Sequence, residues 1–294
     1  MLLSYSRPTG IAFTINGTGG AFLTDSARLV NGRPSSPTRI QWLSGAQTTS
    51  SVLQLRGSWV ASGATPRLRL AGIIGTTLPA GLRIVASTYS GGNWSLNPVE
   101  GVVVERADGV RVCWFHFPEV GYTADGVQFA IYNDRGGFTA LTAGQSVDFG
   151  EIWAGPTEEW RIRPTVQFGI EDYSKSRLSI GGQRFSTPRR VAKTAQVEFV
   201  PVPYDAAFVG EFDSSADMTT GSIDAIRARL QSYAPCVLVT MPRQPFTGET
   251  PITQDYLTRH AEFGFATSVG PIVGEAPRFV FSATFNAPPA LLPT

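Results

Sequence analysis

The chain has 294 residues, of which 16% are charged, and its 24 basic and 23 acidic side chains leave a net charge of +1. Such a balanced charge creates no field that would hold a polyanion, which argues against a nucleic-acid-binding role. The 31 glycines and 21 prolines indicate many short strands joined by tight turns, and the length fits two ordinary domains, so we expect a mainly β protein.

The first half of the chain, residues 1–155, consists of segments of strand length. Apolar and polar residues alternate over residues 11–15, and Asn16-Gly17 then supplies a turn. Segments of similar character follow at 40–42, 51–60, 66–75, 81–90, 110–120, 126–134 and 146–155. About eight strands suit a two-sheet jelly roll, so these segments predict an N-terminal β-sandwich domain.

The order of features in this half resembles that of discoidin-like jelly rolls and related carbohydrate-binding modules. The resemblance covers about half of the chain and implies a sandwich for that half. It rests on Leu29, Asn31, Gly32 and Trp42, followed by the segments Leu68-Arg69-Leu70 and Leu82-Arg83-Ile84.

Three aromatic residues of this half are candidate glycan contacts: Trp42, Tyr89 and Trp94. Tyr89 and Trp94 flank the loop sequence Ser90-Gly91-Gly92-Asn93, and binding residues concentrate on loops. The alternative is that buried aromatics fill the core of the sandwich while the loop aromatics cover its ends.

The second half, residues 156–294, predicts a β-rich assembly domain with one packed α-helix. Strands are expected at 163–170, 177–186, 192–203 and 236–241, followed by an antiparallel pair at 260–270 and 277–285. Apolar residues recur at helical spacing only near residues 220–233, at Ile223, Ile226 and Leu230. Pro235 then ends this helix, whose apolar stripe should pack on a sheet.

The densest basic cluster comprises Arg184, Arg189, Arg190 and Lys193. A phosphate or nucleic-acid site is one interpretation, but Ser186-Thr187-Pro188 predicts an exposed turn there. We favour solvated charge or ion pairs to a neighbouring subunit, which makes the four residues a candidate subunit interface.

Residues for catalysis or metal binding do not form a recognisable pattern. The two histidines, His116 and His260, stand in strand-like sequence in different halves. Two groups of carboxylates could serve a glycosidase but lie in polar, turn-like sequence: Glu158 with Glu159, and Glu211, Asp213 and Asp217. We therefore expect no catalytic residue, cofactor or metal, and do not expect an enzyme.

The sequence shows neither the pattern of a membrane span nor that of a secretory signal. No apolar run reaches the roughly 18 residues that span a bilayer, and no basic n-region with a long apolar core follows Met1. The two cysteines, Cys113 and Cys236, lie in apolar runs where a free thiol packs as a small hydrophobe. We expect no membrane span, reduced cysteines and synthesis in the cytoplasm.

Three motifs within residues 148–199 occur in a characteristic order. They are Phe149-Gly150-Glu151-Ile152-Trp153-Ala154-Gly155-Pro156, then Asp172 to Ser174 with Arg177 or Ser176 after them, then Gly181-Gly182-Gln183-Arg184-Phe185. This segment resembles the tail-tip structural proteins of long-tailed bacteriophages (siphoviruses), in particular distal tail proteins. The later helix and the closing aromatic strands continue the resemblance to about residue 285.

The resemblance implies a virion protein made in the host bacterium and located at the tail tip, or baseplate. Such proteins form homo-oligomeric rings, usually of six copies and sometimes of three, between the tail tube and the host-attachment apparatus. The implied partners are other copies of the chain, the tail tube protein, the tail hub and neighbouring tail-tip proteins. The alternative function is that of a carbohydrate-binding protein engaging a bacterial surface glycan through Trp42, Tyr89 and Trp94. A third possibility is a glycan-cleaving enzyme that uses the carboxylates above.

Overall fold

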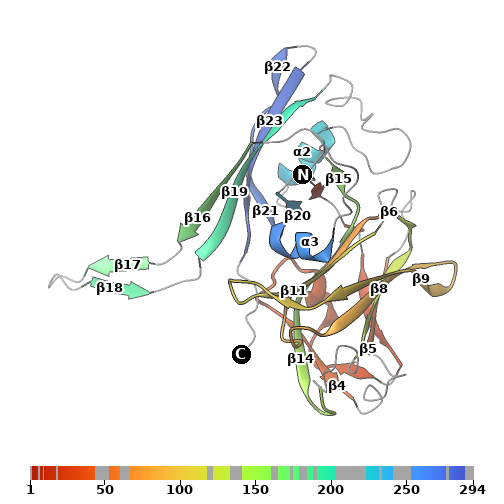
Figure 1. Cartoon of the computed structure of the whole chain (residues 1–294). Coiled ribbons are helices and arrows are strands. Elements are labelled where there is room, and N and C mark those ends of the chain that lie inside the picture. The colour runs from red at the N-terminus through yellow and green to blue at the C-terminus, as the bar shows by residue number, and fades with distance from the viewer. Residues whose placement is uncertain are drawn as a thin grey trace.

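A computed structural model describes most of the chain, and Figure 1 shows its arrangement. The described residues are 2–5, 7–8, 10–17, 19–43, 53–59, 67–117, 122–132, 141–159, 165–172, 175–178, 184–187, 191–202, 223–231, 234–240, 253–275 and 278–288. Three large antiparallel sheets dominate these residues. The mainly β fold predicted from the composition is confirmed.

Two of the sheets form the sandwich expected for the first half of the chain. The five-stranded sheet has the order β2 (Ala12–Asn16), β5 (Leu53–Ser58), β13 (Gly126–Ile131), β8 (Arg83–Ser90) and β9 (Asn93–Val102). The six-stranded sheet has the order β10 (Val104–Glu105), β11 (Arg111–His116), β7 (Leu70–Thr76), β14 (Ser146–Gly155), β4 (Thr38–Trp42) and β3 (Gly20–Phe22). Smaller elements are the 3-10 helix η1 (Ser26–Val30) and the pair β6 (Arg67–Leu68) and β12 (Tyr122–Thr123).

A single apolar core holds the two sheets together. Alternate residues of each strand point between the sheets, so Leu53 and Leu55 of β5 pack in the same buried cluster as Phe115 of β11 and Phe149 of β14. Phe115 and Phe129 meet with ring centroids 5.6 Å apart in a tilted arrangement. The first half is therefore a β-sandwich with an aromatic centre.

The third sheet belongs mainly to the second half of the chain. Its order is β15 (Glu158–Glu159), β1 (Leu2–Ser4), β20 (Pro235–Val239), β21 (Ala261–Val269), β23 (Arg278–Asn286), β19 (Val191–Val202) and β16 (Thr165–Asp172), with β22 (Val273–Glu275) paired to β23. The antiparallel pairing of β21 with β23, predicted from alternating aromatics, is confirmed. The first strand of the chain, β1, lies between β15 and β20, across the boundary expected at residue 155.

Two helices of the described chain accompany this sheet. Helix α2 (Ile223–Gln231) lies where helical spacing predicted it, and its Ile226 and Leu230 are buried against the sheet. Helix α3 (Gln254–His260) was not expected, and it places His260 at a helix end instead of in a strand. Its cap is Thr253, whose side chain accepts a hydrogen bond from the backbone N–H of Tyr256.

The sandwich and the third sheet share a second apolar cluster. From the six-stranded sheet it takes Leu70, Ile74, Val112, Trp114 and Trp153, and from the third sheet and α3 it takes Val237, Val239, Leu257, Ala261 and Phe263. Gln254 of α3 also pairs with both backbone polar groups of Val102, accepting from its N–H at 2.8 Å and donating to its carbonyl at 2.5 Å. The two halves are thus joined by a buried interface.

Strands β17 (Lys175–Leu178) and β18 (Arg184–Thr187) form a separate antiparallel hairpin. The single strand expected at 177–186 is wrong, because these residues contribute to two strands that face one another. We call β17 and β18 together the arm. It projects away from the rest of the molecule beyond the ends of β16 and β19 (Figure 1).

Candidate assembly surface

The edge strand β16 carries an apolar row that grows more exposed toward the arm. Alternate residues of a strand share a face, so Val166, Phe168 and Ile170 lie on the same side of the sheet. Val166 packs against the core under α2, whereas Phe168 is 66% exposed and Ile170 is 77% exposed. β16 pairs with β19 on one side, and no described strand pairs with its other side. An unpaired strand edge beside exposed apolar side chains is a template for another chain.

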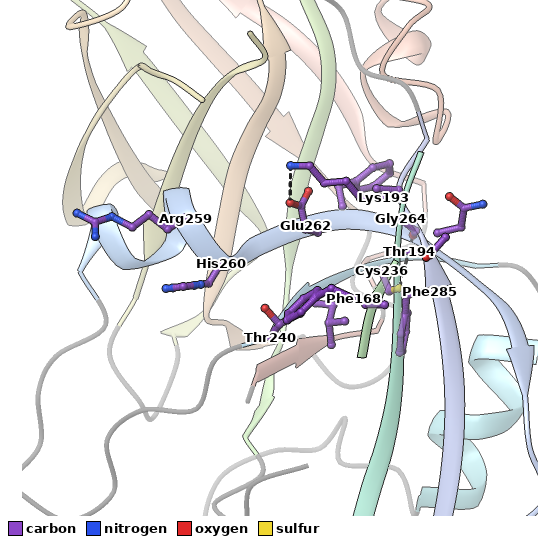
Figure 2. A pocket seen from close by; sticks show the side chains of 15 residues that line it. Phe168, Lys193, Thr194, Cys236, Thr240, Arg259, His260, Glu262, Gly264 and Phe285 are labelled. Atoms are coloured by element: carbon purple, nitrogen blue, oxygen red, sulfur yellow. Dashed lines mark hydrogen bonds and ion pairs between the residues drawn. The ribbon is translucent and has the colours of Figure 1, made fainter. Parts of the chain in front are cut away.

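A cavity of about 340 Å³ lies beside this row. Phe168 lines it together with Ala195 and Phe285, its neighbours across three successive strands, since Ala195 is the register partner of both. Cys236 and Leu238 of β20 complete the apolar lining, and Figure 2 shows Phe168, Phe285 and Cys236 grouped together. The dimensions and lining suit an apolar side chain or small apolar ligand.

The charged side chains at this cavity have partners within the chain. Lys193 Nζ donates to Glu262 Oε1 at 3.1 Å and to Asp108 Oδ2 at 2.8 Å, and the dashed line in Figure 2 marks the contact with Glu262. Arg106 also contacts Glu262. Burial opposes ionisation of Asp108, but the hydrogen bond from Lys193 and the charge of Arg106 lower its pKa below the usual value. The cavity therefore has an apolar lining, and the charged side chains at its rim are paired with opposite charges of the same chain.

Two further titratable groups line the cavity. Burial raises the pKa of the Cys236 thiol to about 12, so this cysteine packs as a small apolar group and carries no nucleophilic thiolate near neutral pH. Burial, followed by the charge of Arg259, lowers the pKa of His260. His260 is therefore neutral at pH 7. The neighbouring Arg259 forms an ion pair with Asp255, with 2.7 Å between the charged atoms.

The predicted interface residues fall in different places. Lys193 lies on β19 with its side chain 48% exposed and bridges the sandwich to the third sheet, a role that the sequence did not suggest. Arg184 lies on β18 of the arm, and only its backbone is described. Arg189 and Arg190 lie outside the described residues. Contact of these four residues with a second subunit stays a prediction.

Trp42 cannot serve as a glycan platform. It is fully buried in the sandwich core between the sheets, so neither face of its indole is open to a sugar ring. This corrects its assignment as a candidate glycan contact and supports the alternative that it fills the core. Burial of a Trp is decided by strand pairing, which periodicity in one strand does not reveal.

Tyr89 and Trp94 do lie together at the surface of the five-stranded sheet. Their rings stack with centroids 4.0 Å apart, and the Arg56 guanidinium lies 4.9 Å from the Trp94 ring centroid. Arg56 also donates to the amide oxygens of Gln128 at 2.7 Å and Gln54 at 3.1 Å. The sequence missed these three polar residues because they come from other strands than Tyr89 and Trp94, although the alternation of Gln54 and Arg56 with buried leucines marks β5 as two-sided.

The other candidate catalytic groups are not brought into one described site. His116 ends β11 of the sandwich and His260 ends α3. Glu158 and Glu159 lie on β15 with only their backbone described, and the group Glu211, Asp213 and Asp217 lies outside the described residues. Within the described ranges, no cluster of three or more His, Cys, Asp or Glu residues could hold a metal ion. Among the same residues, no helix is long and apolar enough to cross a membrane.

A buried ion pair that the sequence did not predict ties the N-terminal segment to the sandwich. Glu151 of β14 is fully buried and accepts hydrogen bonds from Arg7 Nη1 at 2.6 Å and from the Gly32 backbone N–H at 2.8 Å. Burial raises the pKa of Glu151 to about 7, although Arg7 and the N–H donors act in the opposite direction. Arg7 also donates to the Val30 carbonyl and lies 5.9 Å from the centroid of the Trp153 ring.

No protein-family model, curated protein or solved structure matches the chain. Functional inference therefore rests on the residues themselves and on their arrangement.

Proposed function

We propose that the chain is a structural protein of a bacteriophage tail tip, which acts by assembling into a homo-oligomeric ring and not by catalysis. The observation that supports assembly most directly is the exposed pair Phe168 and Ile170 on a sheet edge that no described strand pairs. Soluble proteins usually protect long strand edges with charge, proline, bulges or covering elements. Leaving large apolar side chains at such an edge favours a surface that is covered in the working assembly.

The phage assignment comes from the resemblance of residues 148–199 to tail-tip proteins. In this proposal the ring joins the tail tube to the host-attachment apparatus in the virion. Its partners are other copies of the chain, the tail tube protein, the tail hub and neighbouring tail-tip proteins. The joined sandwich and third sheet suit this role, because a shared buried interface keeps the two halves of each subunit in one orientation.

Light scattering of the purified protein tests ring assembly. We expect a discrete particle of six or three copies of the 31.6 kDa chain, with a mass that is independent of concentration once formed. A control variant, Val273→Asp, places a charge at an exposed apolar residue of β22, away from Phe168 and Ile170. This variant should leave the particle mass unchanged. A protein that remains a monomer at every concentration contradicts the ring.

A second candidate function is glycan binding, favoured by the surface group of Tyr89, Trp94 and Arg56. Aromatic rings beside planar hydrogen-bonding groups suit the apolar and hydroxyl faces of sugars. If this function operates, Trp94→Ala should reduce binding on a bacterial glycan array at least tenfold while leaving the particle mass unchanged. Ser95→Ala, at the exposed neighbouring position, should bind as the wild type does. Equal binding by both variants would remove this candidate.

A further inference from the structure

The arm is a hairpin without support from the rest of the described chain. Among the described residues, β17 and β18 form a two-stranded sheet of their own. A two-stranded hairpin is at best marginally stable alone in water and usually needs a third strand or a packing surface. Figure 1 shows the arm extending away from the body, so the packing surface it requires is not provided by its own sheets.

The edge of β16 and the adjoining cavity form a surface that could supply this support. We call Phe168, Ile170 and the cavity beside them the acceptor surface. The eight-residue edge of β16 offers main-chain hydrogen bonds, while the cavity of about 340 Å³ can receive an apolar side chain. Strand addition gains affinity from the backbone and specificity from pockets that hold alternate side chains.

The sequences of the arm and of the edge strand are complementary in charge. The arm strands, KSRL and RFST, contain three basic residues and no acidic residue. The edge strand, TVQFGIED, contains two acidic residues and no basic residue. The arm also contains Leu178 and Phe185, whose size suits the cavity. Complementary charge favours correct pairing and fixes its register.

We propose that the acceptor surface of one copy binds the arm of a second copy, with Phe185 or Leu178 of that arm seated in the cavity. Donor and acceptor are different surfaces of one chain, so the contact is heterologous and repeats from copy to copy. Such a contact closes into a ring when the rotation between copies permits. This inference rests on the proposed ring and identifies the contact that builds it.

Two variants separate the donor from the acceptor. In the armless variant, Asn-Gly replaces residues 173–190; this is feasible because Asp172 and Val191 are opposite one another in the β16–β19 register and a two-residue turn can join them. In the acceptor variant, Phe168→Asp and Ile170→Asp place charges on the exposed apolar row. Gln167→Asp is the matched control, since its exposed side chain lies on the opposite face of β16.

Each variant alone should be a monomer by light scattering, because each retains only one of the two surfaces. Mixed in equal amounts, they should form a dimer of one armless and one acceptor-variant chain, and no larger species. Gln167→Asp should assemble as the wild type does. If either variant alone forms the wild-type particle, the contact lies elsewhere and this inference fails while the ring survives. A monomeric wild type would instead contradict the proposed ring itself.

Cross-linking provides a readout that does not depend on the folding of these variants. A photoreactive phenylalanine analogue at position 185 of the otherwise unchanged chain should cross-link to the segments that form the acceptor surface, which are residues 165–172, 193–195, 236–240, 259–264 and 285–287. Mixing isotopically light and heavy chains before irradiation should show that the linked peptides come from different copies. Cross-links only within one copy, or only to other segments, would overturn the inference.

Discussion

Replacing Trp153 with alanine is expected to lower the free energy of unfolding by about 3 to 5 kcal/mol. Trp153 is fully buried in the apolar cluster shared by the sandwich and the third sheet. Its ring meets Phe263 of β21 edge-on with centroids 6.1 Å apart, and its Nε1 donates to Ser4 Oγ of β1 at 2.9 Å. The variant therefore loses buried apolar area, leaves a cavity and removes a hydrogen-bond donor from a buried hydroxyl.

Chemical denaturation followed by circular dichroism measures this effect. Trp94→Ala is the matched control, because Trp94 is half-buried on the outer face of the sandwich and its loss should cost about 1 kcal/mol. Since Trp153 connects the halves, its loss should also broaden or split the unfolding transition as the sandwich and third sheet become less coupled. Equal destabilisation by the two substitutions would show that Trp153 does not hold this joint.

The second large effect expected is a pH dependence of stability that arises from Glu151. Burial raises the pKa of Glu151 from its ordinary value of 4.5 to about 7 in the folded protein. Between these values the folded state retains a proton that the unfolded chain has released. The contribution of Glu151 to stability is therefore complete below about pH 4.5 and declines as the pH rises to about 7.

Glu151→Gln should remove this pH dependence, because the amide keeps a similar shape without titrating. The difference in unfolding free energy between the wild type and Glu151→Gln should fall by roughly 3 kcal/mol between pH 4.5 and 7 and then remain constant. Denaturant titrations at half-unit pH intervals measure it. Glu100→Gln, at an exposed carboxylate paired with Arg83, should show a change below about 1 kcal/mol. A difference that rises with pH would indicate that Arg7 lowers the pKa of Glu151 more than burial raises it.

The periodicity of apolar residues was enough to predict the strands and the helix that are specified by one contiguous segment. Partial alternation identified the strands at β5, β7 and β8, and helical spacing identified α2. It failed for short elements, since the seven residues of α3 span barely two helical turns and the three residues of β1 have no measurable period. The hairpin of the arm was taken for one strand because its two halves are each only four residues long.

The candidate site was less accessible to sequence analysis than the fold. The mainly β class, the sandwich of the first half, the second β-rich region and the helix near residue 223 could be predicted from the amino-acid sequence, because composition, alternation and turn residues act locally. Three features emerged from the folded structure alone: Trp42 is buried, Glu151 contacts Arg7, and Phe168 and Phe285 line one cavity at the sheet edge. Those facts depend on which strands pair across more than 100 residues, and pairing is selected by the packing of the whole chain and not by any one segment.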